Sequence, residues 1–362
     1  MPTLQDVARR AGVSTATVSK VLSNTPYFTE ETRRKVMHAV DELGYVPNLA
    51  ARALAAGKTH IVAVVFPYVY EPIFSDPLTL RILGGIESVI TQRGYNMLLS
   101  TPRLSRAAPD AHYLQLVQSG YLDGLIAIDN VPEVSVIDVA REKGLPSVVI
   151  GYDVRDGDNW VHSDDVSGGE QIMTHVLELG HRAIGLITVP ENINMALEHR
   201  LKGLRTVAEA AGLDFDRLPR ADGDFSTTSG AAGAADLLSR HPELTALICL
   251  NDRMALGAIQ QARLMGRRVP GDLTVTGYDD IPAAASFAPP LTTIDQRAPE
   301  SGQTAAHMLF DILAGATPDN AVLPVRFVER ESTAAPYSAP DSVPNRSVAS
   351  MLPEPREEDT AD

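Results

Sequence analysis

Residues 3–58 read TLQDVARRAGVSTATVSKVLSNTPYFTEETRRKVMHAVDELGYVPNLAARALAAGK and begin with two short helical patterns on either side of a glycine. Thr3 is followed three residues later by an acidic residue, which is the spacing of a capping box and predicts a helix start. Gly12 ends this helix, and Ser14 is expected to cap a second one that extends from residue 15 to about residue 22.

A third helix is predicted to start at Thr29, with two glutamates in its first turn, and to end near Gly44. Two helices joined by a short turn that contains a glycine have the helix-turn-helix geometry. This geometry predicts that the second helix enters a DNA major groove. The alternative interpretation is an αα-corner with a purely structural role.

The second helix has one apolar and one polar face. Val18, Val21 and Leu22 are expected to face the first helix. The other face carries small hydrogen-bonding groups, one methyl group and one cation, which can lie against base edges and phosphates without steric conflict. The candidates for DNA contact on this helix are therefore Thr15, Ala16, Thr17, Ser19 and Lys20.

A short alanine-rich segment follows the third helix. Pro47 ends the preceding element, and Asn48 can cap a new helix over residues 48–58, in which alanine is favourable. So short a helix is marginal alone in water, and it therefore needs a partner helix or a DNA surface. Leu54 is then placed to act as an apolar wedge between base steps of a minor groove. Alternatively, Leu54 is the packing residue of an ordinary linker helix.

This N-terminal stretch resembles the headpiece and hinge of the LacI/GalR family of bacterial transcription regulators. The matching strings are TLQDVARRAGVS, TVSKVL and YVPNLAARAL, and they occur in the family's order. By that resemblance Thr15, Ala16 and Lys20 read bases, Thr17 contacts a phosphate and Leu54 is the minor-groove lever. The complete DNA-contacting set that we expect is Ser14, Thr15, Ala16, Thr17, Lys20, Asn48 and Leu54.

The charge of the chain is divided unequally. Its formal net charge is −15, but residues 1–60 hold eight Lys or Arg and five Asp or Glu, which leaves −18 for the remainder. A basic end on an acidic body is expected of a DNA-binding module joined to a domain that does not bind DNA. The single cysteine, Cys249, lies in an apolar run, so we expect a buried thiol in a reducing cytoplasm.

From residue 60 onward short apolar runs alternate with longer amphipathic stretches, which predicts βαβ units and doubly wound parallel sheets. About a hundred residues for each set of runs predicts two similar subdomains. Strands are expected near 61–66, 95–100, 123–128, 146–151, 183–188, 245–250 and 272–276, with crossovers or edge strands at 291–295 and 322–328. Helices are expected near 78–93, 111–119, 133–143, 166–179, 197–211, 229–240 and 253–265.

Open sheets bind ligands beyond the carboxyl ends of their strands. Asn251 and Asp279 each follow a predicted strand, and Arg200 begins a helical segment. Together with Phe74 and Phe225 they suit a sugar or polyol, because polar side chains bind hydroxyl groups and an aromatic side chain covers a ring face. The structural alternatives are a helix cap, a turn residue, a surface cation and core packing for the two phenylalanines.

The family resemblance extends over residues 60–332. The matching strings are ELGHRAIG (178–185), RLKGL (200–204), NDRMALGA (251–258), RVPGDLTVTGYDDIP (268–282) and PPLTTIDQ (289–296). This resemblance implies an effector domain with a fold like that of the periplasmic binding proteins. In that domain the resemblance implies effector contacts for Phe74, Arg200, Asn251 and Asp279, and an aromatic platform at Phe225.

The expected fold is therefore α/β, with a helix-turn-helix headpiece and an effector domain of two doubly wound parallel-sheet subdomains. The predicted boundaries are 1–47 for the headpiece, 48–58 for the hinge helix and 60–332 for the effector-binding and dimerisation domain, with crossovers near 160–164 and 288–296. Residues 336–362 are rich in Pro, Ser and acidic residues and are expected to form a disordered acidic tail.

These expectations describe a repressor that binds a palindromic operator as a homodimer and is controlled allosterically by a small effector, with a sugar favoured. The alternatives are a purine or another metabolite as effector, or a solute-binding protein with the same cleft, which would need a secretory signal that we do not find. An enzyme is not expected, because adjacent carboxylates such as Asp279 and Asp280 point to opposite faces of an extended chain. We expect a cytoplasmic, nucleoid-bound protein that needs no cofactor, metal or membrane.

Overall fold

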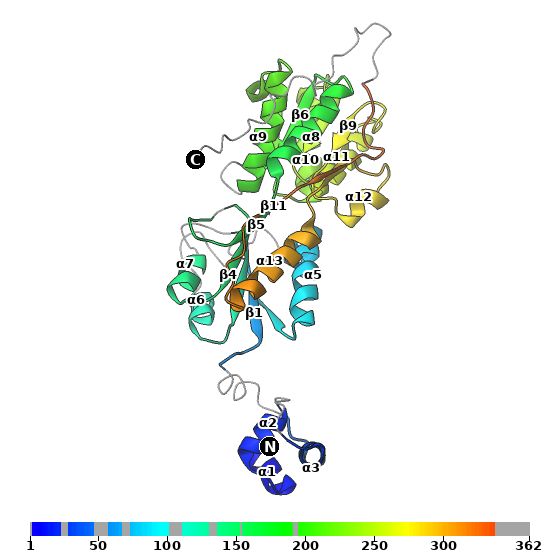
Figure 1. The fold of residues 1–362 in the computed structure, drawn as a ribbon. Helices are drawn as coiled ribbons and strands as arrows, with labels where there is room; N and C mark the ends of the chain where they lie inside the picture. The colour runs from blue at the N-terminus through cyan, green and yellow to red at the C-terminus, as the bar shows by residue number, and fades with distance from the viewer. Residues whose placement is uncertain are drawn as a thin grey trace, which may run out of the picture. The chain divides into compact units, whose positions relative to one another are not determined.

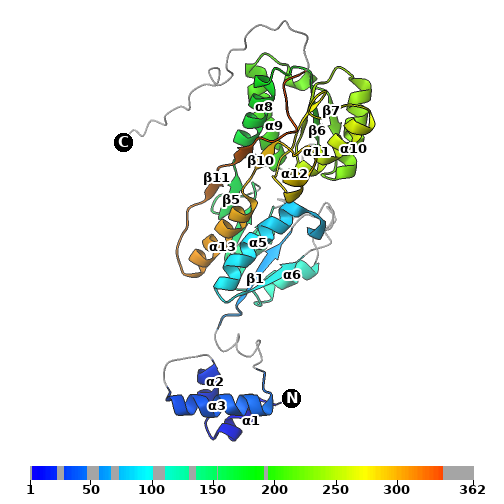
Figure 2. The ribbon, with the colours of Figure 1, turned by 90° about the vertical axis from the view of Figure 1, so that its right-hand side faces the viewer.

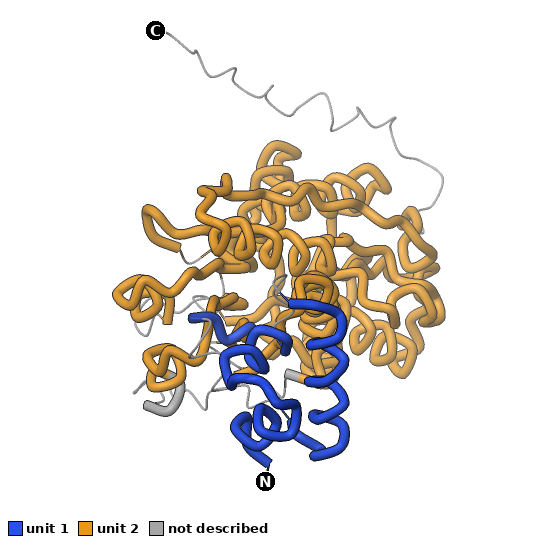
Figure 3. Tube along the Cα trace, turned by 60° about the horizontal axis from the view of Figure 1, so that its bottom comes forward, with its two compact units in different colours: residues 1–60 blue, residues 61–362 orange. Residues whose placement is uncertain are grey.

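The computed structural model describes residues 2–22, 28–46, 57–66, 73–100, 111–129, 136–152, 154–190 and 195–336. The chain divides into two compact units, residues 1–60 and residues 61–362 (Figure 3). Most of the predicted hinge helix, including Asn48 and Leu54, lies outside the described residues, and so does the tail after Pro336.

The first unit contains three helices, α1 (Leu4–Ala11), α2 (Thr15–Leu22) and α3 (Glu30–Leu43). Both arms of the predicted capping box at Thr3 are present, because the Asp6 N–H donates to Thr3 Oγ1 and the Thr3 N–H donates to the Asp6 carboxylate. The helices α1 and α3 end at glycines with left-handed backbone, as predicted. The three helices predicted from the sequence are confirmed.

A small apolar core joins the three helices. Val7 on α1, Val18 and Val21 on α2, and Val36 on α3 are all buried in it. The predicted inward face of α2 is therefore confirmed, and its other face is directed away from the core.

The first sheet of the second unit is six-stranded and parallel, in the order β11-β5-β4-β3-β1-β2. Figure 1 labels β11, β5, β4 and β1 of this sheet. Its strands are β1 (Ile61–Val65), β2 (Asn96–Ser100), β3 (Gly124–Ile128), β4 (Ser147–Ile150), β5 (Trp160–Ser163) and β11 (Ala321–Leu323). In this order β1 has β2 on one side and β3 on the other, so the sheet has the switch point at which doubly wound folds bind ligands.

Helices cover both faces of this sheet. Val62 and Val64 of β1 pack with α5 (Pro77–Gln92) and α13 (Ala298–Leu313), which lie side by side (Figure 2). The alternate residues Ala63 and Val65 pack with α6 (Ala111–Gln118) and α7 (Val136–Glu142) on the other face. A short 3-10 helix, η1 (Ile73–Ser75), precedes α5.

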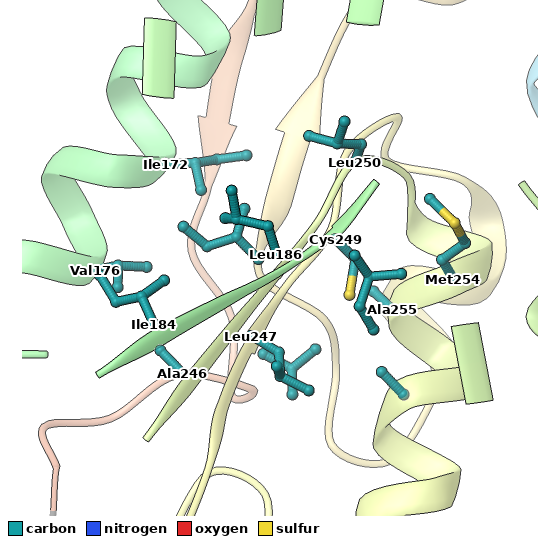
Figure 4. Packing of buried hydrophobic residues seen from close by; sticks show 14 of the residues in the cluster. Ile172, Val176, Ile184, Leu186, Ala246, Leu247, Cys249, Leu250, Met254 and Ala255 are labelled. Carbon is teal, nitrogen blue, oxygen red and sulfur yellow. The ribbon is translucent and has the colours of Figure 1, made fainter. Parts of the chain in front are cut away.

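The second sheet is four-stranded and parallel, in the order β7-β6-β8-β9. Its strands are β6 (Ile184–Thr188), β7 (Arg220–Asp222), β8 (Ala246–Cys249) and β9 (Thr274–Thr276). The flanking helices are α8 (Asp165–Glu178), α9 (Met195–Ala210), α10 (Thr227–Arg240) and α11 (Asp252–Leu264), with the shorter η3 (Phe215–Arg217) and α12 (Pro282–Ser286). Figure 4 shows side chains of α8 and of α11 packed on opposite sides of these strands.

The chain passes between the two sheets near Asp164, again around β10 (Thr293–Asp295), and again around β12 (Arg326–Val328). The strands β10 and β12 form an antiparallel ladder of their own. The segment that follows β12 returns to the second sheet, where the Val275 N–H donates to the Ser332 carbonyl. We did not predict α13, although Pro299 in its first turn is a recognised helix-start signal.

Glycines bring three helix pairs into close contact. A Cβ at Gly169 of α8 would overlap the Arg200 carbonyl of α9, and one at Gly203 of α9 would overlap the Val166 carbonyl of α8. The pairs α5–α13 and α10–α11 have the same reciprocal arrangement. The glycines of these two pairs are Gly85 and Gly302, and Gly230 and Gly257.

Candidate functional site

The second unit contains a cavity of about 200 Å³ that is lined from both sheets. Its walls are formed where parallel strands end and the helices that follow them begin, as expected for open α/β sheets. The polar lining residues are Asp76, Thr79, Asp129, Tyr152, His162, Ser163, Asp165, Arg200, Asn251, Arg253, Asp279, Gln296 and Ser301. The bulkier apolar ones are Phe66, Leu78, Ile82, Ile128, Ile150, Leu197 and Phe225.

Arg200, on α9, is buried in the cavity wall with 6 % of its surface exposed. Its Nε donates to Asp165 Oδ1 at 2.8 Å and its Nη1 to the Leu250 carbonyl at 2.8 Å. The guanidinium carbon lies 3.7 Å from the ring centroid of Tyr278, and Nη1 is 3.7 Å from Asp279 Oδ1. Burial opposes the charge, but Asp165 above all keeps the pKa of Arg200 above its usual value. The surface-cation alternative is therefore wrong for Arg200.

Asp279 lies after β9, with its Oδ1 3.7 Å from Arg200 Nη1. Its backbone φ is +116°, a left-handed conformation that is unusual for a residue other than glycine and that the surrounding contacts hold. Its Oδ1 accepts a hydrogen bond from Gln296 Nε2 at 2.7 Å. Burial raises the pKa of the Asp279 carboxyl well above its usual value, against the lowering effect of Arg200. A ligand hydroxyl could satisfy this buried group.

Asn251 and Phe225 form a connected corner of the cavity. Asn251 Oδ1 caps α11 by accepting from the Met254 N–H at 2.9 Å, and its Nδ2 donates to the Phe225 carbonyl at 3.1 Å. Phe225 has a φ of +69° and packs partly against the core of the second sheet. Asn251 therefore both caps α11 and lines the cavity.

Phe74 does not join the other predicted effector residues. It lies on η1 with 66 % of its surface exposed, and it does not line the cavity. Phe66, which directly follows β1, lines the cavity instead. The position of Phe66 at the end of a predicted strand was a signal that we did not use.

Tyr152, His162 and Asp165 also line the cavity and were not predicted. The Tyr152 ring stacks on the imidazole of His162 at a centroid distance of 4.0 Å and makes a tilted contact with that of His199 at 4.2 Å. Trp160 stacks on the other side of His162 at 4.6 Å. Trp160 and His162 lie on strand β5, and Tyr152 lies in the loop before it. The sequence motifs assign no role to this part of the chain.

In the first unit, the outward side of α2 carries the candidate DNA contacts. Thr15, Ala16 and Lys20 are exposed there. Ser14 is the cap of α2, because the Thr17 N–H donates to Ser14 Oγ at 3.1 Å, and the two hydroxyls are 2.9 Å apart. These two side chains therefore fix the start of the helix next to the exposed residues.

Among the residues that the structure describes, no helix combines the length and the apolar character that a membrane span requires. The same residues contain no group of three or more His, Cys, Asp or Glu side chains suited to hold a metal ion. Cys249 is a free and buried thiol, as expected.

A helix-turn-helix unit joined to an α/β unit with a cavity at its strand ends defines the class of ligand-responsive DNA-binding regulators. Residues 3–48 match the family described as bacterial regulatory proteins, lacI family, and residues 173–333 match a periplasmic binding protein-like domain. The chain is 34 % identical over 337 residues to the HTH-type transcriptional regulator CelR of Thermobifida fusca, covering 91 % of this chain and 98 % of that protein. The chain belongs to the LacI family of transcription regulators.

Further relatives and solved structures agree. The HTH-type transcriptional repressor PurR of Photobacterium profundum is 32 % identical over 313 residues, 86 % of this chain and 92 % of PurR. The Lac repressor dimer bound to operator and the anti-inducer ONPF superimposes with a TM-score of 0.82 at 30 % identity, over 92 % of this chain and 99 % of that one. A CelR–cellobiose complex superimposes with a TM-score of 0.69 at 32 % identity, over 92 % and 100 %.

Proposed function

We propose that this protein is a homodimeric repressor whose affinity for a palindromic operator is set by a neutral sugar bound in the cavity. The observation that carries the proposal is that Arg200, Asn251, Asp279 and Phe225 line one cavity. The guanidinium, amide and carboxylate groups bind hydroxyls, and the phenyl ring can cover a sugar face. The relative CelR, whose complex with cellobiose superimposes on this chain, supports a sugar.

The charge of the lining supports a neutral ligand. It includes the carboxyl groups of Asp76, Asp129 and Asp165, beside that of Asp279, whose pKa is raised by burial. The cationic side chains of the lining are Arg200 and Arg253, and Arg200 already pairs with Asp165. An anionic ligand such as a sugar phosphate would meet more negative than positive charge, whereas hydroxyl groups find many acceptors.

A purine is the second candidate effector, because several relatives are named PurR. A nucleobase would favour two aromatic side chains that stack on its faces. Phe74 does not line the cavity, whereas Phe66 and Phe225 do. The ligand screen described below therefore includes nucleosides and nucleobases.

The regulation that we propose is a population shift. The effector stabilises one arrangement of the two subdomains, and this alters how the first subdomains of a dimer meet and so how the two headpieces are spaced on paired half-sites. Because binding linkage is reciprocal, operator must change effector affinity by the same factor as effector changes operator affinity. The protein acts in the bacterial cytoplasm, on the nucleoid, without chemical turnover of the sugar.

A thermal-shift screen of the full chain tests the ligand class. The panel contains cellobiose, other mono- and disaccharides, their phosphates, nucleosides and nucleobases. A specific ligand raises the melting temperature in proportion to the logarithm of its concentration above the dissociation constant. We expect a neutral sugar to do so and sugar phosphates to fail. A nucleobase as the only ligand would replace the sugar, and no stabilising compound would contradict the sensing role.

A further inference from the structure

We propose that Asp165 is a positioning residue for Arg200 and that Tyr152 ties this pair to the first subdomain. The proposal rests on the proposed function, because it concerns how the cavity presents Arg200 to an effector. Asp165 is 2 % exposed, and its Oδ1 accepts from Arg200 Nε at 2.8 Å. Its Oδ2 lies 3.0 Å from the Tyr152 hydroxyl. Arg200 Nε thus holds one carboxylate oxygen, the Tyr152 hydroxyl lies beside the other, and we infer that the carboxylate acts through Arg200.

The close contact of α8 and α9 makes this ion pair possible. Asp165 precedes Gly169 by four residues on α8, and Arg200 precedes Gly203 by three on α9, so each residue lies on the same helix face as its glycine. The backbones of the two helices touch at these glycines. The Asp165 carboxylate and the Arg200 guanidinium are thus brought together at the cavity end of the helix pair.

The guanidinium is oriented as well as neutralised. Nε is held by Asp165, Nη1 by the Leu250 carbonyl, and the flat face by the Tyr278 ring. Arginine has five N–H donors in a fixed plane, so these three restraints leave the remaining donors in one defined direction. Arg200 lines the cavity, and those donors are the ones that can fork across two ligand oxygens.

Tyr152 connects this arrangement to the other subdomain. It follows β4 of the first sheet, whereas Asp165 begins α8 of the second subdomain. The Tyr152 hydroxyl accepts the Asp165 N–H at 3.2 Å and donates to either the Ser163 carbonyl or the Asp165 carboxylate. The Tyr152 ring also packs against His199, the neighbour of Arg200 on α9. A change in the angle between the subdomains must therefore disturb the support of Arg200.

Two substitutions and one control separate this role from general stability. Asp165→Asn removes the charge that holds Arg200, and Tyr152→Phe removes the hydroxyl while it keeps the stacked ring. Asp164→Asn is the matched control, because Asp164 caps α8 through the Ser167 N–H and asparagine is an equally good cap. It removes the same charge from the neighbouring position without touching Arg200.

The first measurement needs no effector. Hydrogen exchange of the Arg200 Nε–H is followed by NMR on the ¹⁵N-arginine-labelled full chain, with the signal assigned by its loss in Arg200→Lys. We expect exchange at least about tenfold faster in Asp165→Asn, a smaller acceleration in Tyr152→Phe, and the parent rate in Asp164→Asn. Equal rates in all three variants would overturn the positioning role. If Asp165→Asn does not fold, Tyr152→Phe still tests the proposal. An unchanged exchange rate of the Arg200 Nε–H in Tyr152→Phe would contradict the proposed support of the Asp165–Arg200 pair by Tyr152.

The second measurement is calorimetric titration with cellobiose. We expect affinity about tenfold or more lower in Asp165→Asn, a smaller loss in Tyr152→Phe and a change within about twofold in Asp164→Asn. Lower affinity without faster Arg200 exchange would mean that Asp165 touches the ligand itself, which overturns the proposal. If the parent protein does not bind cellobiose, the titration uses the neutral sugar that the thermal-shift screen identifies. If the screen finds no sugar, that result contradicts the proposed function, while the exchange measurement decides the positioning role alone.

Discussion

The side chains that we assign to effector binding differ in what else they do in the protein. Asn251 caps α11 and holds the Phe225 carbonyl, so its loss would damage the fold as well as the cavity. The Asp279 carboxyl has Gln296 as its hydrogen-bond donor and Arg200 as its ion-pair partner. Asp279 is therefore the better probe of ligand binding at the scale of single residues.

We predict that Asp279→Ala abolishes the effector response and leaves operator affinity without effector within about threefold. The substitution removes an acceptor from the cavity of the second unit and changes no residue of the headpiece. Operator binding by fluorescence anisotropy, with and without the sugar that the screen identifies, measures both quantities. Asp216→Ala is the control, since Asp216 is an exposed residue of the same subdomain. A normal response in Asp279→Ala would place the ligand elsewhere.

Lys20 supports a second prediction at this scale. If Lys20 reads a base, Lys20→Ala should cost about 1–3 kcal/mol of specific binding and relax the preference at one operator position. Non-specific binding should change much less. Lys35→Ala, on α3 and paired with Glu31, is the control cation. Equal losses of specific and non-specific affinity would instead assign Lys20 to a phosphate.

Arg200, Asn251 and Asp279 lie in the strings quoted above, and together with Phe225 they line one cavity. Their contact with an effector stays a prediction. Tyr152 and Asp165 could not be predicted, because their role depends on contacts between segments that the chain brings together only on folding. Such contacts carry no periodic signal in the sequence.

At the scale of helices and strands, the reciprocal glycines set the distance between paired helices. We predict that Gly203→Ala destabilises the protein by about 1–3 kcal/mol, because its Cβ would press on the Val166 carbonyl and must push α8 and α9 apart. Urea denaturation measures the change. Gly84→Ala is the control, since a Cβ there meets no atom within 4 Å and helix propensity should make it neutral or stabilising. A neutral Gly203→Ala would contradict the tight crossing.

The buried imidazole of His181 gives a prediction on pH. His181 is 1 % exposed and contacts the hydroxyls of Thr245 and Thr274 and the Ala334 carbonyl, which hold the final described segment on the second sheet. Burial lowers the pKa of His181 in the folded protein. Below about pH 6.5 the unfolded chain therefore binds a proton that the folded chain does not, and stability falls as pH falls.

As the pH falls from 7.5 to 5.5, we expect the urea midpoint of the parent to fall relative to that of His181→Gln, which cannot take up that proton. His307→Gln, at an exposed position on α13, should keep the parent dependence on pH. Identical pH profiles for His181→Gln and the parent would refute this assignment.

Elements with strong periodic patterns were predicted well, and short or connecting ones were not. Both ends of α2 agree with the prediction, and β1 agrees to within one residue. The strands β5 and β7 and the helix α13 were missed. β7 has only three residues, and β5 follows a polar loop, so neither shows a clear run of apolar residues.

At the scale of the whole molecule, a helix-turn-helix unit is joined to a second unit whose cavity is lined from both of its sheets. The pattern of strands and helices predicts both sheets. It does not predict that the chain returns to the first subdomain after the second sheet and adds α13 and β11 there, which only the tertiary structure shows. The cavity lies where the chain crosses between subdomains, because Ser163, Asp165 and Gln296 all line it. Ligand binding at the crossings is what makes a coupling between the two functions physically reasonable.

The most direct test of this coupling is a titration of the operator complex with the sugar identified in the thermal-shift screen, on an operator selected from random duplexes. Operator affinity is measured by anisotropy over a range of sugar concentrations, and sugar affinity is measured with and without saturating operator. We predict that sugar changes operator affinity by about 5- to 150-fold and that operator changes sugar affinity by the same factor. An operator affinity that is independent of a sugar bound in the cavity would contradict the account.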